Sequence, residues 1–142
     1  MRYYRGKRTD TGEWVFGSLI VWLDGDADIC IAGTDSECEL PKVTISPETA
    51  GQFTGIYTME EIEGGDTRCT FIYEGDIVEA VLTDGIHQGF SWGRHVVVFD
   101  QGAFCLKNRR GEITPMCNYS VNVKFKVLGN IHDNPELLEV SA

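Results

Sequence analysis

Short apolar segments separated by turn residues run through this chain and constrain its fold most strongly. The segments are rich in Val, Ile, Phe, Tyr and Trp, and Gly, Asp or Asn stands between them. β-branched and aromatic residues are enriched in strands, whereas the separating residues are typical of turns. Helical spacing of apolar residues is scarce. The pattern therefore predicts a mainly β fold.

The clearest strands are expected in the second half of the chain, where turn signals stand between apolar runs. Gln101 and Gly102 predict a two-residue turn, and the residues Tyr73 to Asp76 predict another. Short strands at this spacing indicate a small barrel or sandwich. The five strands expected there are Cys69–Tyr73, Asp76–Leu82, Arg94–Asp100, Ala103–Lys107 and Val121–Leu128.

The first half predicts shorter and less regular elements. The run from Glu13 to Leu23 predicts one long strand or two bent ones, followed by a tight hairpin turn at Asp24 and Gly25. Returning strands are expected over 29–32 and 42–45. Pro47 fits the first position of a single helical turn. At the other end of the chain, Asn134 can cap a short C-terminal helix that begins with Pro135.

Length and composition predict one soluble domain over residues 1–142. At 142 residues with 42% hydrophobic residues, the chain has enough apolar surface for one core, and no run approaches the roughly 20 apolar residues of a membrane helix. No apolar segment follows the charged N-terminus, as a secretory signal would require. We therefore expect a cytoplasmic protein that does not bind membranes.

Charge is unevenly distributed along the chain. Residues 1–8 carry four basic residues and no acidic one, whereas residues 9–66 carry thirteen acidic residues against Lys42 alone. The net charge is −10. An acidic surface repels nucleic-acid phosphates and attracts basic protein surfaces, so nucleic acid is an unlikely partner.

Two nucleic-acid-related alternatives stay open. In the first, aromatic residues among basic ones bind nucleic acid, because bases stack on aromatic rings in basic grooves. The competing interpretation of the same segment is a first strand with charged edge residues. In the second, the acidic residues Glu60, Glu61, Glu63 and Asp66 mimic nucleic acid and inhibit a host protein. The residues of the first alternative are Arg2, Tyr3, Tyr4, Arg5, Lys7 and Arg8.

No motif of the sequence predicts catalysis, a cofactor or a metal site. Asp24, Asp26 and Asp28 alternate as in a calcium loop, but Ile29 and Asp35 occupy the positions that require Gly and Glu. The three histidines, His87, His95 and His132, are expected at the surface or in capping roles. No nucleophile elbow or phosphate loop is present, so we expect no enzyme.

The five cysteines do not predict disulfides. Their number is odd, they are widely spaced, and no Cys-x-x-Cys pair occurs. Free, buried thiols are therefore expected in a reducing compartment. The residues are Cys30, Cys38, Cys69, Cys105 and Cys117.

Three motifs stand in an order that resembles one known family. They are Gly-Gln-Phe-Thr-Gly at 51–55, Ile-Tyr-Glu-Gly-Asp-Ile-Val at 72–78, and the run from Leu128 to Leu138. Together with the basic residues at the start of the chain and the sequence Trp14-Val15-Phe16-Gly17, these motifs resemble the YopX family of phage and prophage proteins. The resemblance implies an N-terminal β region over about 1–50 with a hairpin, and a small SH3-like barrel over about 51–142. It implies no established activity.

One segment departs from the family pattern. Where the family usually has a short hairpin, this chain has an insertion from Tyr57 to Thr70, which is expected to be an acidic, exposed hairpin tip or loop.

The motif residues have two interpretations. Glycine and Asn-Pro chemistry at turns is enough to explain them as architecture. Alternatively, their polar side chains gather at a binding groove. The residues of this binding alternative are Gln52, Thr54, Glu74, Asp76 and Asn130.

The favoured functional hypothesis is a non-catalytic, phage-encoded interaction or assembly protein. Its protein partner is unknown from the sequence. The many strands of the chain also suggest self-association into an oligomer as one form of such an assembly.

Overall fold

The computed structural model describes residues 4–31, 42–83, 90–119 and 122–139. Its backbone contacts divide the chain into two compact units, Met1–Phe53 and Thr54–Ala142. The strand registers described within them are antiparallel. The predicted mainly β architecture is therefore confirmed.

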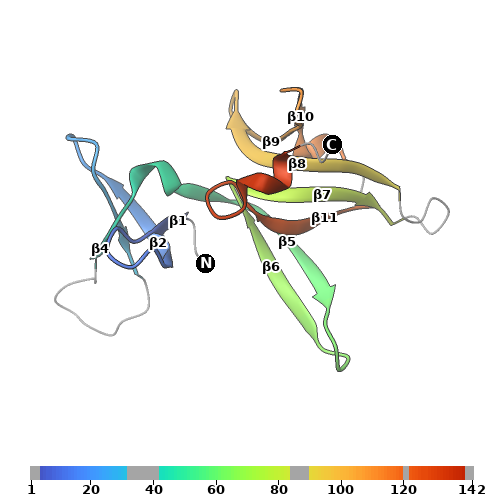
Figure 1. Cartoon of the computed structure of the whole chain (residues 1–142), viewed down its shortest axis with the longest axis horizontal. Helices are drawn as coiled ribbons and strands as arrows, with labels where there is room; N and C mark the ends of the chain where they lie inside the picture. Colours follow the sequence, from blue (N-terminus) through green and yellow to red (C-terminus); the bar gives the residue numbers. More distant parts are fainter. Residues whose placement is uncertain (1–3, 32–41, 84–89, 120–121, 140–142) are drawn as a thin grey trace. The chain divides into compact units, whose positions relative to one another are not determined.

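The first unit consists mainly of short strands (Figure 1). Its strands follow the order β4-β3-β2-β1, and the start of β5 pairs with the other side of β1. Tyr4 thus lies opposite Gly17 on β2 and opposite Gln52 on β5. The elements are β1 (Tyr4–Lys7), β2 (Trp14–Val21), β3 (Ala27–Cys30), β4 (Lys42–Ile45), the 3-10 helix η1 (Pro47–Thr49) and the first residues of β5 (Gly51–Glu61).

The turn between β2 and β3 lies where the sequence predicts it. Gly25 has a φ of 93°, a conformation that glycine adopts without strain, and its N–H donates to the Trp22 carbonyl at 3.0 Å. The loop is longer than a two-residue turn, because the Trp22 N–H donates to the carbonyl of Asp26. The returning strand begins at Ala27, two residues before the predicted position.

The core of the first unit is small. Ala27, Ile29 and Ile45 are almost fully buried, and Tyr4 and Val15 are among the apolar residues packed against them. Strand β1 lies between β2 and β5, so the prediction that it is an edge strand with charged residues is wrong. Because it is central, Arg5 is buried and is not a solvated edge charge.

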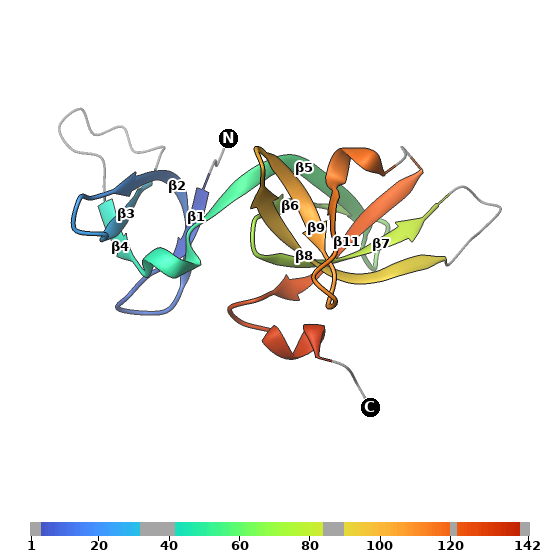
Figure 2. The same ribbon diagram turned by 90° about the horizontal axis from the view of Figure 1, so that it is seen from above.

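The second unit contains a five-stranded sheet and a long hairpin. The sheet has the order β10-β9-β8-β7-β11, and its middle strands lie side by side in Figure 2. The hairpin is formed by the rest of β5 and by β6. The elements are β6 (Thr67–Tyr73), β7 (Asp76–Leu82), β8 (Ser91–Asp100), β9 (Ala103–Lys107), β10 (Ile113–Pro115), β11 (Val123–Asn130) and the 3-10 helices η2 (Met116–Asn118) and η3 (Pro135–Leu138).

A larger apolar core holds the second unit together. Ile72 of β6 packs with residues of β7, β8 and β9, and the side chains of Ile56 and Phe125 pack against this cluster. Burial of apolar side chains from both the hairpin and the sheet stabilises their contact. The fully or nearly fully buried members are Ile72, Val78, Ala80, Val97, Leu106 and Met116.

The described strands form open sheets and not a closed barrel. Strand β11 stands at one end of the five-stranded order and β6 at one end of the six-stranded order. The SH3-like closure is therefore not seen within the described part of the chain. The predicted C-terminal helix appears as four residues of 3-10 helix, η3, shown in red in Figure 2. Asn134 does not cap it through its side chain.

The expected loop at the insertion is mostly strand. Residues 57–61 belong to β5 and residues 67–70 to β6, leaving a short turn at 62–66. Tyr57 and Phe71 meet across the hairpin with ring centroids 6.3 Å apart, and Arg68 pairs with Glu60 at 3.0 Å. The prediction of a hairpin tip is confirmed, but the insertion lengthens two strands instead of forming an acidic loop.

Candidate functional site

Four of the five polar motif residues lie in the second unit, and the side chains of Thr54, Asp76 and Asn130 bond to nearby backbone. Asp76 is 2% exposed and its Oδ2 accepts a hydrogen bond from the Tyr73 N–H at 2.8 Å. The strand register places Asp76 opposite Asn130. The Thr54 hydroxyl donates to the Ile72 carbonyl at 2.8 Å. Glu74 lies in the turn between β6 and β7.

Asn130 orders the segment after β11 through its side-chain amide. Its Oδ1 accepts hydrogen bonds from the N–H groups of His132 and Asp133, and its Nδ2 donates to Asp133 Oδ2 at 3.1 Å. The Asn134 Oδ1 turns back to accept from the Asn130 N–H at 3.3 Å. These contacts give the motif an architectural role. Gln52 belongs to the first unit, and a common binding groove for all five residues remains a prediction.

The basic N-terminal segment contacts its own unit. The Arg5 guanidinium lies 4.6 Å from the centroid of the Trp14 ring and Lys7 Nζ lies 5.5 Å from it, both within cation–π range. Arg8 forms a two-point ion pair with Asp10, at 2.8 Å for each bond. Arg2 and Tyr3 lie outside the described residues. Nucleic-acid binding by this segment remains a prediction.

The histidines and cysteines differ from expectation in burial. His95 is buried, with Nδ1 3.0 Å from the Gly93 carbonyl oxygen, so its predicted surface position is wrong. His87 and Cys38 lie outside the described residues. Cys30, Cys69, Cys105 and Cys117 are free thiols, of which Cys69 and Cys117 are exposed, contrary to the prediction of buried thiols. Burial raises the pKa of the Cys105 thiol.

The three alternating aspartates also have local roles. Asp24 Oδ1 accepts a hydrogen bond from the Asp26 N–H, and Asp28 Oδ2 accepts one from the Trp22 indole. Within the ranges 4–31, 42–83, 90–119 and 122–139, no three His, Cys, Asp or Glu side chains gather as metal ligands. Across those same residues, no helix has the length and apolar character needed to cross a membrane.

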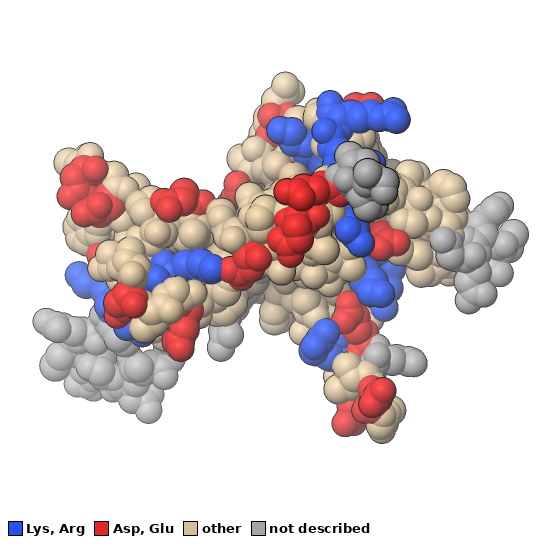
Figure 3. Space-filling view, in the orientation of Figure 1, with Lys and Arg blue, Asp and Glu red and all other residues tan. Residues whose placement is uncertain are grey.

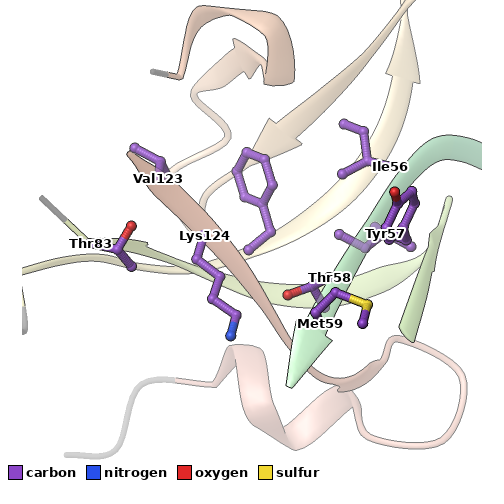
Figure 4. A pocket seen from close by; sticks show the side chains of 9 residues that line it. Ile56, Tyr57, Thr58, Met59, Thr83, Val123 and Lys124 are labelled. Atoms are coloured by element: carbon purple, nitrogen blue, oxygen red, sulfur yellow. The ribbon is translucent and has the colours of Figure 1, made fainter. Parts of the chain in front are cut away.

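The feature that we assign as the candidate site is a cavity of about 390 Å³ between β5 and β11 (Figure 4). All of its lining residues belong to the second unit. Its size is within the range of sites that bind small molecules or peptide side chains. The lining residues are Ile56, Tyr57, Thr58, Met59, Ile72, Thr83, Val123, Lys124 and Phe125.

Strand geometry determines which side chains of β5 reach this cavity wall. Side chains alternate between the two faces of a strand, so Ile56 and Thr58 share one face and Tyr57 and Met59 the other. Ile56 packs on the core and Thr58 is 6% exposed, whereas Tyr57 is 58% and Met59 49% exposed. Thr58 thus occupies a buried position that the alternation would ordinarily give to an apolar residue.

The hydroxyl of Thr58 is the unusual group in this cavity. Its Oγ1 is buried and has no hydrogen-bond partner among the residues that the structure describes. Figure 4 shows this oxygen directed toward the Lys124 side chain of β11. A buried hydroxyl without a partner costs about 1–3 kcal/mol of stability. The second buried threonine, Thr49, instead donates to the Ser46 carbonyl at 2.6 Å and accepts from the Lys7 N–H.

A second cavity, of about 460 Å³, lies beside an aromatic cluster of the same unit. Trp92 and Tyr119 line it, and their rings meet edge to face with centroids 5.8 Å apart. Phe90 and Phe125 extend this chain of aromatic contacts at its two ends. Burial raises the pKa of the Tyr119 hydroxyl. These contacts are between the aromatic residues themselves and explain the cluster as packing.

Sequence reasoning did not single out Thr58. The sequence signal that could have revealed Thr58 was the alternation of core-facing and exposed positions along Ile56-Tyr57-Thr58-Met59. Interpretation of this segment as an inserted loop concealed that signal, because alternation has meaning only within a strand.

Fold and cavity together define a class: antiparallel β proteins with an open strand edge beside a cavity of mixed polar and apolar lining that contains a buried polar group. The family model of the YopX protein matches residues 3–139, and the chain therefore belongs to the YopX family. The predicted resemblance is confirmed.

The fold is shared with a solved structure. The crystal structure of protein yopX from Bacillus subtilis matches with a TM-score of 0.53 and 23% sequence identity, over 96% of this chain and 98% of that chain. No curated protein matches the chain.

Proposed function

We propose that this chain is a non-catalytic protein-interaction module that binds an extended segment of a partner protein between β5 and β11. The observation that carries the proposal is the buried, unpartnered Thr58 hydroxyl in a cavity beside an edge strand. Extended peptides bind to exposed sheet edges, and pockets for alternate side chains supply specificity. A partner that donates to or accepts from Thr58 Oγ1 offsets the cost of its burial.

The proposal also relates the cavity to the open sheets of the second unit. We propose that the second unit is an SH3-like barrel left open between β5 and β11, and that the bound segment occupies the place of the missing strand. The support is the terminal position of β11 in its sheet and the cavity that both strands line. We propose further that this activity takes place in the cytoplasm of a bacterium carrying a phage or prophage, as the sequence motifs led us to expect.

The first test is Thr58→Val, which keeps the side-chain shape and removes the hydroxyl. We expect stability to rise by about 1 kcal/mol, because a buried group without a partner is replaced by an apolar one. We expect affinity for peptides selected on the wild-type protein from a random display library to fall about tenfold. Urea denaturation and titration calorimetry measure the two effects.

Thr49→Val is the matched control, since Thr49 is 7% exposed and makes two hydrogen bonds. We expect this variant to lose about 1–3 kcal/mol of stability and to bind the same peptides unchanged. Selection of no peptides, or equal peptide affinity in wild type and Thr58→Val, would contradict the proposed function.

A further inference from the structure

We propose that the bound segment pairs as an added strand with the open edge of β11 and carries an acidic side chain that Lys124 recognises. The inference rests on the proposed function and specifies the chemistry of its ligand. Three observations carry it: the direction of the β11 backbone groups, the position of Lys124, and the buried Thr58 hydroxyl.

The register of β11 fixes which backbone groups face its open edge. Thr83 donates its N–H to the Asn122 carbonyl, which makes these two residues a hydrogen-bonded pair in the antiparallel ladder. Hydrogen-bonded and non-bonded pairs alternate along such a ladder. Val123 lies opposite Leu82 and Phe125 opposite Ala80, so both are in non-bonded positions. Their N–H and carbonyl groups consequently point away from β7.

The open edge is therefore a template for one more strand. Within the described part of the chain, the sheet order ends at β11 and no strand pairs with its outer edge. An extended segment that pairs there acquires backbone hydrogen bonds with Val123 and Phe125. The same segment lies along the cavity, because both residues line it.

Charge selects the kind of segment. The Lys124 side chain reaches into the space beside Thr58 in Figure 4, and the ammonium makes no ion pair among the described residues. Lys126, two residues further on the same face of β11, is exposed. In contrast, Glu60 on the β5 side is already paired with Arg68. Among the described residues that line the cavity, Lys124 alone carries a charge, and its positive charge favours an Asp or Glu side chain on the bound segment.

The preference for an acidic segment depends on the charge close to the cavity and not on the net charge of the whole chain. On the face drawn in Figure 3, acidic and basic side chains both occur, although the net charge of the chain is −10. Recognition instead requires the short distance between one carboxylate and Lys124. The favoured ligand is an extended peptide with a carboxylate beside Lys124 and a side-chain or backbone polar group beside Thr58.

The test uses nine-residue peptides selected from a random display library on the full chain. We expect Asp or Glu to be enriched at one position of the selected peptides. Lys124→Glu should weaken their binding about tenfold and Lys124→Gln less, whereas Lys107→Glu, on an exposed strand position that does not line the cavity, should leave it unchanged. Thermal unfolding shows whether each variant is folded.

Backbone N-methylation tests the strand pairing. We make the selected peptide with N-methyl groups on either of its two alternating sets of amides. Methylation of one set should abolish binding and methylation of the other should not, because only one set of amides faces β11 in an added strand.

Several outcomes would overturn the inference. If Thr58→Val weakens binding while Lys124→Glu and both methylated peptides do not, the acidic-strand inference fails and the proposed function stands. If none of the variants matters, both fail. Occupation of the cavity by a second copy of the chain, detected by sedimentation, or competition by a thymidine oligonucleotide would also overturn the acidic-peptide inference.

Discussion

Gly17→Ala is expected to destabilise the first unit by about 3 kcal/mol or more. Gly17 is buried on β2, and a Cβ at this position would overlap the carbonyl oxygen of Cys30 on β3 and lie 2.9 Å from its carbonyl carbon. Both atoms belong to a paired backbone, so no flexible side chain can move aside. Urea denaturation followed by the amide resonances of the first unit measures the loss.

Ser18→Ala is the control for Gly17→Ala, because Ser18 is the exposed neighbour on the same strand. This change should alter stability by less than about 0.5 kcal/mol. Equal stability of Gly17→Ala and wild type would show that β2 and β3 do not approach as closely as described.

Asp76→Ala is expected to cost the second unit about 1.5–3 kcal/mol, the range for a hydrogen bond to a charged group. The buried carboxylate accepts a hydrogen bond from the N–H of the buried Tyr73, and the substitution removes this acceptor. The bond closes the turn that leads from β6 into β7, so the loss affects two core strands. Thermal or urea unfolding measures it.

Asp76→Asn separates this hydrogen bond from the other properties of the side chain. The amide oxygen of Asn can still accept from Tyr73, so we expect a smaller loss than with Ala. An Asn variant as unstable as the Ala variant would show that the negative charge, and not the hydrogen bond, stabilises this turn.

Turn chemistry explains why much of the fold was predictable. The predicted bounds of Asp76–Leu82 and Ala103–Lys107 agree with β7 and β9, and the turn between β8 and β9 lies at Gln101 and Gly102. Both turn residues have positive φ, at 49° and 83°. Local residue preferences were sufficient here because the turn and its flanking strands are contiguous in sequence.

Longer-range features were not predictable in the same way. Charged residues at 60, 61 and 63 suggested a loop, although the strands of this hairpin are stabilised by cross-strand pairs such as Tyr57 with Phe71. The short strand β10 was missed, because its three residues end in proline and give little periodic signal. The central position of β1 depends on its pairing with β5, more than forty residues away in the sequence.

The candidate site depends on partners that sequence does not reveal. A threonine at position 58 could be read as an ordinary strand residue, and only the structure shows that its hydroxyl is buried without a partner. Conversely, Asp76 and Asn130 drew attention as motif residues, but their side chains bond to nearby backbone. Whether a polar group is satisfied is a property of the packed chain.

Amide hydrogen exchange of β11, with and without a selected peptide, tests the central claim most directly. In the free protein, the N–H groups of Val123 and Phe125 should exchange faster than those of Lys124 and Lys126, which face β7. Saturating peptide should slow exchange at Val123 and Phe125 and leave β1 of the first unit unchanged. Protection confined to β1 or to the residues around Trp92, with no change at Val123 and Phe125, would contradict binding between β5 and β11.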